Sequence, residues 1–388
     1  MSQLFLYDDE SAREFEPFSL TRPVSELRAG VELVRQRWEQ ALSLRADGSL
    51  SAPHLAGFED PASGAPPVWL EAVPKGAVIA NSRCVPAAGL VAAPADVWTC
   101  GGQVAAVRRA RSVEPDELSG GRLALESLAG TAARRGELPG RGRWLAEPWS
   151  FIVQLLPQLF DDIAALGPLM SCTRPAATVL GEHAVYVEEG ACVEPHVVLD
   201  ATAGPILLRA GATVRAFTRL VGPCAVWHGA TVLGDRVHGC SIGEGSIVRG
   251  EISESVVLGN ANKTHDGFVG HSYLGRWVNL GAGTITSNLK NTYGTVSMWT
   301  PRGIRDTGVA KLGTLFGDHV KTGIGVRLTT GTVVGAGSNV YGSEMPPKYV
   351  PPFSWGDGHS LRPYRLDKFL ETAERAMGRR QVPLGERA

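Results

Sequence analysis

An aliphatic residue recurs every six positions over much of the second half of the chain, and this spacing limits the possible folds more than any other feature. Helices repeat every 3.6 residues and strands every two, so neither explains a period of six. This six-residue spacing is interrupted twice and resumes each time. Its members are Leu208, Val214, Leu220, Val226 and Val232, then Phe268, Leu274 and Leu280, then Leu328, Val334 and Val340.

This period is typical of the hexapeptide repeats of a parallel β-helix. Each run of six forms one side of a triangular coil, and the aliphatic residue points inward. A small residue fits beside it, and glycine or asparagine takes the corners, where left-handed backbone is needed. Coils stack at roughly 4.8 Å through strand hydrogen bonds. The pattern predicts a β-helix over 176–345 whose frame breaks from about Asn288 to Leu312, where a long loop leaves it.

The flanking segments are different. Residues 1–165 predict an α/β domain with strands at 4–8 and around Ile79, and a hairpin that turns at Gly101-Gly102. Apolar spacing predicts a helix over 24–42 and another over 149–166, kinked at Pro157. We expect 134–144 to be a loop. Residues 346–388 predict a loop and an amphipathic helix packed across the last coil.

Composition excludes several classes of protein. The net charge is −1, which does not favour nucleic acid or an anionic membrane. No apolar run or signal peptide is evident, so we expect a cytoplasmic protein. The six cysteines have no metal-binding spacing, which predicts small buried thiols and no metal site. Five of the seven lysines fall between 263 and 348, a weak indication of an anionic ligand that a solvated surface explains equally well.

One stretch carries a specific motif. His265 is followed by Phe268 and by NLGAGTITSN from Asn279 to Asn288. This order resembles the acetyltransferase domain of GlmU, the bifunctional glucosamine-1-phosphate acetyltransferase and N-acetylglucosamine-1-phosphate uridyltransferase. PFSLTRPVSELR, NKTHDGF and PPFSWG resemble a group of GlmU-like proteins described as sugar nucleotidyltransferases. The resemblance implies a left-handed β-helix behind a degenerate nucleotidyltransferase-like domain.

The resemblance also implies a transferase that uses acetyl-CoA or another acyl-CoA. His265 would be the general base, because imidazole suits proton abstraction near neutral pH. The acceptor would be an amino sugar phosphate or a nucleotide sugar, and the assembly a homotrimer with sites between subunits. The implied binding residues are Phe268, Asn279 and Asn288 for the sugar, and Ala282, Gly283, Lys311, Lys321 and Arg327 for the acyl-CoA. His271 is interpreted as structural.

The sequence departs from this family at several positions. Phe268 stands where the family usually has tyrosine, and no clear basic counterpart for a sugar phosphate precedes His265. Near the N-terminus, YDDESAREFE replaces a glycine-rich nucleotide loop, and Val24 replaces a lysine. Mg²⁺ would be required only if nucleotidyl transfer is retained. Arg22 and Arg28 are candidates for phosphate contact, or for salt bridges to acids such as Glu26.

Three hypotheses therefore remain open. The first is acyl transfer with His265 as base. The second is sugar-1-phosphate nucleotidyl transfer by the N-terminal domain, with the β-helix as a trimer scaffold. The third is a sugar-nucleotide-binding scaffold without catalysis.

Overall fold

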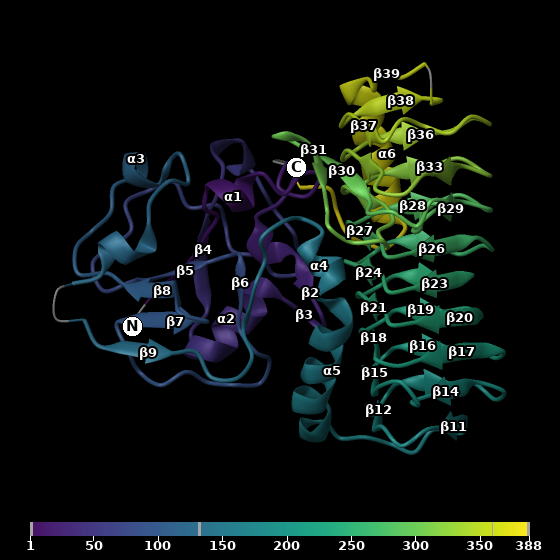
Figure 1. Ribbon diagram of the computed structural model, residues 1–388, viewed down its shortest axis with the longest axis horizontal. Coiled ribbons are helices and arrows are strands. Elements are labelled where there is room, and N and C mark those ends of the chain that lie inside the picture. The colour runs from purple at the N-terminus through teal and green to yellow at the C-terminus, as the bar shows by residue number, and fades with distance from the viewer. Residues whose placement is uncertain (1–2, 131–132, 359, 386–388) are drawn as a thin grey trace. The chain divides into compact units, whose positions relative to one another are not determined.

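The computed structural model describes residues 3–130, 133–358 and 360–385. Two compact units divide the chain, the first ending at Pro148 and the second running from Trp149 to Leu384 (Figure 1). No helix among the described residues is long and apolar enough to span a bilayer.

The first unit is built on a six-stranded mixed sheet in the order β4-β1-β5-β8-β7-β9. Its strands are β1 (Leu4–Tyr7), β4 (Ala46–Leu50), β5 (Val78–Asn81), β7 (Val97–Cys100), β8 (Gln103–Arg108) and β9 (Arg135–Glu137). β1 runs parallel to β4 and β5. The β7–β8 hairpin is confirmed, and Gly101 and Gly102 turn it with φ of 57° and 80°. The unit's helices are α1 (Glu10–Arg13), α2 (Val34–Leu42) and α3 (Pro115–Leu118).

Two expectations for the first unit are wrong. Within the helix predicted over 24–42, only α2 is α-helical. Val24–Glu26 form a short 3-10 helix, and Gly30, with φ of 62°, turns the chain between β2 (Arg28–Ala29) and β3 (Glu32–Leu33), which pair as a hairpin. The expected loop at 134–144 instead contributes β9 to the sheet, and β10 (Arg143–Trp144), which pairs with β6 (Cys84–Val85).

The second unit is a parallel β-solenoid of about ten turns, whose three faces are stacks of short strands. The first face contains β11 (Thr178–Leu180), β14 (Val198–Asp200), β17 (Thr218–Val221), β20 (Asp235–His238), β23 (Glu251–Ser253) and β26 (Phe268–Gly270). The second contains β12 (Val185–Val187), β15 (Ile206–Leu208), β18 (Cys224–Val226), β21 (Ser241–Ile242), β24 (Val256–Val257), β27 (Tyr273–Leu274), β32 (Leu315–Phe316), β35 (Val333–Val334) and β37 (Tyr349–Val350). The third contains β13 (Cys192–Val193), β16 (Thr213–Val214), β19 (Thr231–Val232), β22 (Ile247–Val248), β25 (Asn262–Lys263), β28 (Asn279–Leu280), β33 (Lys321–Thr322), β36 (Asn339–Val340), β38 (Ser354–Gly356) and antiparallel β39 (Arg362–Pro363).

The inward rows confirm the predicted architecture, apart from its handedness, which stays a prediction. Leu208, Val226, Ile242 and Val257 stack in register and are buried. The intervals between these residues show that successive coils contain 18, 16 and 15 residues. The shorter coils explain why the six-residue spacing is interrupted between Val232 and Phe268. The six-residue spacing predicted that Phe268 points inward. This prediction is wrong, because the shortened coils place Val269 in the core instead.

The corners also differ from expectation. Bulky residues hold left-handed backbone where glycine or asparagine was expected, among them Phe217, His271 and Trp277 with φ of 64°, 48° and 61°. Such conformations are costly for large side chains, so the stacked strands on either side must hold them in place.

The helices of the second unit pack along the solenoid. α4 (Ser150–Val153) and α5 (Leu155–Leu166) lie beside the second face, where Phe151 meets Tyr273 edge to face at 5.4 Å. The predicted kink is a break at Gln154, and Pro157 stands in the first turn of α5, where proline is tolerated.

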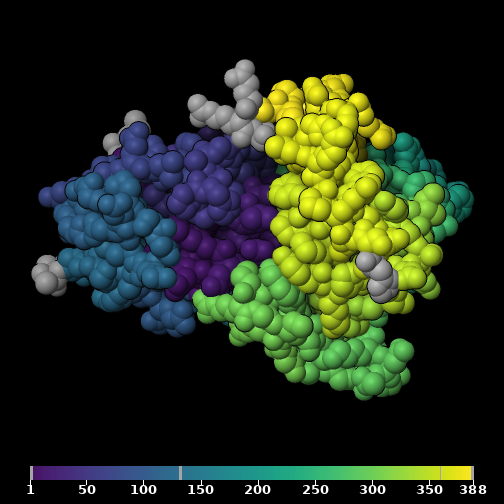
Figure 2. Space-filling model, turned by 90° about the horizontal axis from the view of Figure 1, so that it is seen from above, coloured from purple at the N-terminus to yellow at the C-terminus, as the bar shows by residue number. Residues whose placement is uncertain are grey.

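Two further segments cover the other end of the solenoid. α6 (Leu366–Gly378) packs Phe369 against His319 and Phe353, at the corners of two coils. The break in the repeat forms a hairpin of β30 (Ser297–Thr300) and β31 (Gly303–Asp306), whose Trp299 stacks on Tyr349 at 3.6 Å. Figure 2 shows the C-terminal segment in yellow over this end, with the hairpin region in green beside it.

The prediction that all cysteines are buried is wrong for two of them. Cys192 is exposed on β13 of the first coil, where no earlier coil covers the strand, and Cys172 is exposed at an isolated bridge to Glu188 before that coil, while the other four thiols are buried.

Candidate active site

His265 lies on a turn between the third and first faces of the solenoid. β25 ends at Lys263 and β26 begins at Phe268, and both His265 and Asp266 are exposed between them. One coil further on, the backbone N–H of Gly283 donates to the Asp266 carbonyl at 3.0 Å. The structure therefore brings the His265 turn and the Ala282-Gly283 corner together, although they are 17 residues apart in sequence.

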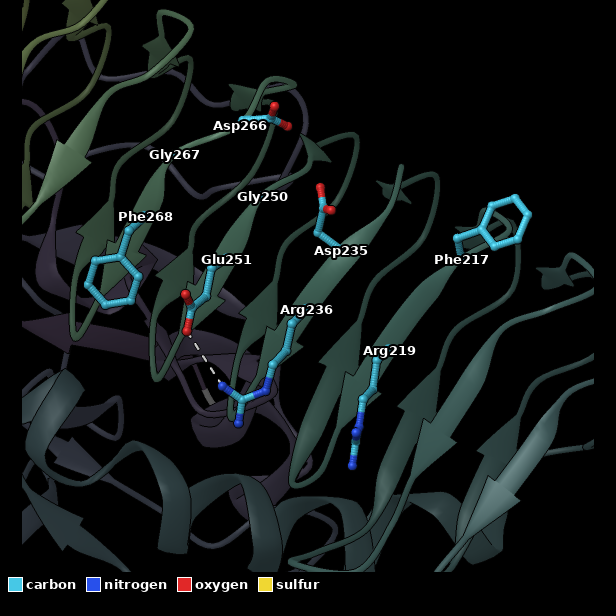
Figure 3. A pocket seen from close by; sticks show the side chains of 9 residues that line it. All are labelled: Phe217, Arg219, Asp235, Arg236, Gly250, Glu251, Asp266, Gly267 and Phe268. Carbon is cyan, nitrogen blue, oxygen red and sulfur yellow. Dashed lines mark ion pairs between the residues drawn. The ribbon is translucent and has the colours of Figure 1, made fainter.

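A groove of about 620 Å³ lies on the first face beside this turn (Figure 3). Four outward side chains from successive strands form a row along it: Arg219, Arg236, Glu251 and Phe268. The corner residues complete the lining: Phe217, Asp235, Gly250, Asp266 and Gly267. His265 is not in the lining, but the three residues that follow it are.

Charges of both signs alternate around this groove. Arg219 binds Asp200 at 2.5 Å, and Arg236 lies 3.5 Å from Glu251. Hydrogen bonds from Thr202 and then Arg219 lower the pKa of Asp200 to about 2, so this carboxylate remains charged at neutral pH. Arg249 bridges Asp235 at 3.1 Å and Asp266 at 3.5 Å across neighbouring corners.

The two asparagines of the motif have different surroundings. Asn279 accepts a hydrogen bond from the Asn262 amide at 2.8 Å on the third face. Asn288 donates to Nδ1 of the buried His271 at 2.9 Å, and Nε2 of that ring lies 3.3 Å from Glu254. Hydrogen bonding to His271 lowers the pKa of Glu254. With both nitrogens engaged, His271 holds a corner of the solenoid.

The lysines of the solenoid mostly bind backbone oxygens. Lys321 donates to the Trp277 carbonyl at 3.1 Å and the His319 carbonyl at 3.4 Å, and burial lowers its pKa to about 8. Lys290 and Lys348 donate to the carbonyls of Thr295 and Ser297. Lys311 is exposed. The concentration of lysines in this region therefore has a structural explanation in the carbonyls of corners and loops.

Arg22 and Arg28 of the first unit are both buried. Arg22 binds Asp60 at 3.1 Å and Arg28 donates to the Val31 carbonyl, while Glu26 is paired with Arg35 at 2.5 Å.

The carboxyl ends of β1, β4 and β5 are where parallel sheets usually bind ligands. Asp8 follows β1 and accepts hydrogen bonds from the Ser51 hydroxyl and the Val24 N–H. Asp9 caps α1 and is bound by Arg83 at 2.7 Å. These carboxylates serve the protein's own donors, and among the described residues no group of three or more acidic, histidine or cysteine side chains could hold a metal.

Comparisons with known proteins address both units. Residues 4–168 match a family model described as sugar nucleotidyl transferase. A bifunctional sugar-1-phosphate nucleotidylyltransferase/acetyltransferase from Sulfurisphaera tokodaii is 35% identical over 24% of this chain and 23% of its own. Bifunctional protein GlmU from Methanococcus vannielii is 35% identical over 30% of this chain and 27% of its own. GlmU from Desulfitobacterium hafniense is 28% identical over 46% of this chain and 42% of its own.

The chain is similar to GlmU over part of its length. It nevertheless spans less than half the length of each of these curated relatives. The groove residues Arg219, Arg236, Glu251 and Asp266 were not predicted from the sequence. Their one available signal is their spacing of 15 to 17 residues, which follows the shortened coils.

Proposed function

We propose that this protein is a transferase that moves an acyl group from acyl-CoA to an amino sugar phosphate or nucleotide sugar bound in the groove of the first face. The observation that carries the proposal is the position of His265, on an exposed turn directly beside that groove and one coil from the Ala282-Gly283 corner.

In this reaction His265 takes a proton from the acceptor amine as nitrogen attacks the thioester carbonyl. The new C–N bond forms, the C–S bond breaks, and the coenzyme leaves as a thiolate that takes the proton back from His265. Phe268 offers an apolar face to the sugar ring, and Asn279 and Asn288 remain candidate polar contacts. Small residues at Ala282 and Gly283 let an extended pantetheine chain approach the backbone, with Lys311, Lys321 and Arg327 as candidates near the phosphates.

We further propose a cytoplasmic homotrimer in which a neighbouring copy completes each site. The β-solenoid and the similarity to GlmU support this assembly. Size-exclusion chromatography with light scattering tests the assembly, and a monomer that carries full activity would rule out a shared site.

The direct test is release of free thiol from acetyl-CoA in the presence of amino sugars, their phosphates and nucleotide amino sugars. We expect turnover by the wild type and a loss of 10²-fold or more, on the order of a general base's contribution, in His265→Ala. His228→Ala is the matched control, because His228 is also exposed and its ring lies 2.9 Å from the Ala210 carbonyl at another corner. Equal turnover in wild type and His265→Ala rules the assignment out.

Nucleotidyl transfer by the first unit is the second candidate, favoured by the family match over residues 4–168. Release of pyrophosphate from a nucleoside triphosphate and a sugar phosphate would support it.

A further inference from the structure

Lys263 occupies a position that the neighbouring coils fill with aliphatic side chains. In the inward row of the third face, Val214 pairs with Val232, Val232 with Val248, and Val248 with Lys263. Lys263 is only 1% exposed, so its stem lies in the apolar core. A cation in such a row is unfavourable unless its ammonium is bound, and a valine would serve packing better.

The ammonium of Lys263 reaches the corner that carries His265. It donates to the Arg249 carbonyl at 3.0 Å and to the His265 carbonyl. These oxygens belong to successive coils, so the lysine ties the His265 turn to the corner beneath it. The turns after Val232 and Val248 have no such tether, because a valine cannot donate a hydrogen bond.

Gly250 leaves the space that this contact needs. A Cβ at position 250 would lie 3.0 Å from the Lys263 ammonium and 2.6 Å from the Gly267 carbonyl, and its φ of 94° disfavours other residues. Gly250 and Gly267 both line the groove, so the ammonium lies directly beneath its floor. Burial lowers the pKa of Lys263 to about 8, while Asp266 and Asp235 favour the charged form and Arg249 opposes it.

We propose that Lys263 is a positioning residue that fixes the His265 turn beside the groove. The proposal rests on the function proposed above. Its physical basis is that proton transfer requires the base within hydrogen-bond reach of the acceptor, and a displacement of about 1 Å can cost about 10²-fold in rate.

The test compares Lys263→Met and Lys263→Gln with Lys348→Met. The methionine keeps the stem without a donor, and the glutamine keeps a shorter, neutral donor. Lys348 is the control, because it too is a partly buried lysine that donates to one backbone carbonyl, that of Ser297 at 3.2 Å. We expect Lys263→Met to lower kcat about 10- to 100-fold with KM for acetyl-CoA within about twofold, and Lys263→Gln to fall between it and the wild type.

A second readout does not depend on turnover. The rate at which diethyl pyrocarbonate modifies His265, followed by peptide mass spectrometry, should change several-fold in Lys263→Met and not in Lys348→Met. Unchanged kcat, unchanged His265 reactivity, or failure of both Lys263 variants to fold would each overturn the proposal. If Lys263→Met is fully active while His265→Ala is inactive, only the positioning role fails. If His265→Ala is active, the proposed function fails and the positioning role with it.

Discussion

Replacing Asp8 by asparagine should stabilise the first unit at neutral pH. Asp8 is 1% exposed, and burial raises its pKa from 3.8 to about 6 despite hydrogen bonds from Ser51, Ser82 and Val24. A carboxyl whose pKa is raised by folding binds its proton more tightly in the folded state. Its contribution to stability is therefore fully present below the unfolded pKa and is lost as pH rises through about 6.

The size of the effect follows from the two pKa values. A shift of about two units corresponds to about 3 kcal/mol of destabilisation at pH 7.5, and to about 1.6 kcal/mol at pH 5. Asp8→Asn keeps an oxygen for the Val24 N–H and offers an amide N–H to the Ser82 hydroxyl. We therefore expect a gain of about 1–3 kcal/mol at pH 7.5 that shrinks by about half at pH 5.

Urea denaturation of the full-length chain, followed by brief proteolysis and mass spectrometry of peptides from β1 and β5, measures this unit separately from the solenoid. Ser119→Ala, an exposed change in the same unit, is the control. A loss of stability in Asp8→Asn at pH 7.5, or a gain independent of pH, would refute the reasoning. Stabilisation of the wild type but not Asp8→Asn by Mg²⁺ would instead make Asp8 a metal ligand.

Three further predictions concern the solenoid. Phe268→Ala should raise KM for the acceptor about tenfold with little change in melting temperature, because this ring lines the groove instead of the core. Steady-state kinetics and a thermal melt measure the two effects. Leu280→Ala should cost about 2–5 kcal/mol in denaturant titration of the second unit, because its side chain is 1% exposed in the core row. Trp299→Ala should lose the stack on Tyr349, worth about 0.5–1.5 kcal/mol beyond area burial, and speed hydrogen exchange in β30 and β31; unchanged exchange there would contradict it.

The solenoid was predictable because its core depends on a local rule. Each face of a coil places an aliphatic residue in the core at a regular interval, so the spacing of Leu208, Val214 and Leu220 shows directly which side chains point inward. The β7–β8 hairpin was predictable for a similar reason, since only a tight turn needs two consecutive glycines.

The predictions are wrong where the position of a residue depends on the length of a coil or on tertiary contacts. Shortened coils move the frame by one residue, so Phe268 turns outward to the groove while Val269 fills the core. They also align Arg236 and Glu251, which no fixed six-residue count would place in one row. In the first unit, the residues around Gly30 have helical apolar spacing, but the left-handed backbone of Gly30 turns them into a hairpin.

The sequence contains a signal for the hydrogen bonds from Lys263 to the His265 turn, although they were not predicted. Lys263 falls six residues before Val269 in the inward frame, which is the signal that a lysine occupies a core position. Recognising it required knowing where the frame resumes after the shortened coils, and that depends on how neighbouring strands pair.

The most direct test of the proposed function allows acetyl transfer and nucleotidyl transfer to occur in the same mixture and identifies which product forms. Wild-type protein is incubated with acetyl-CoA, Mg²⁺, nucleoside triphosphates and the acceptor panel, and all products are identified by mass spectrometry. Our proposal predicts an acceptor heavier by one acetyl group, absent from the His265→Ala reaction. A nucleotidyl product and pyrophosphate with no acetylated acceptor, unchanged in His265→Ala, would contradict it.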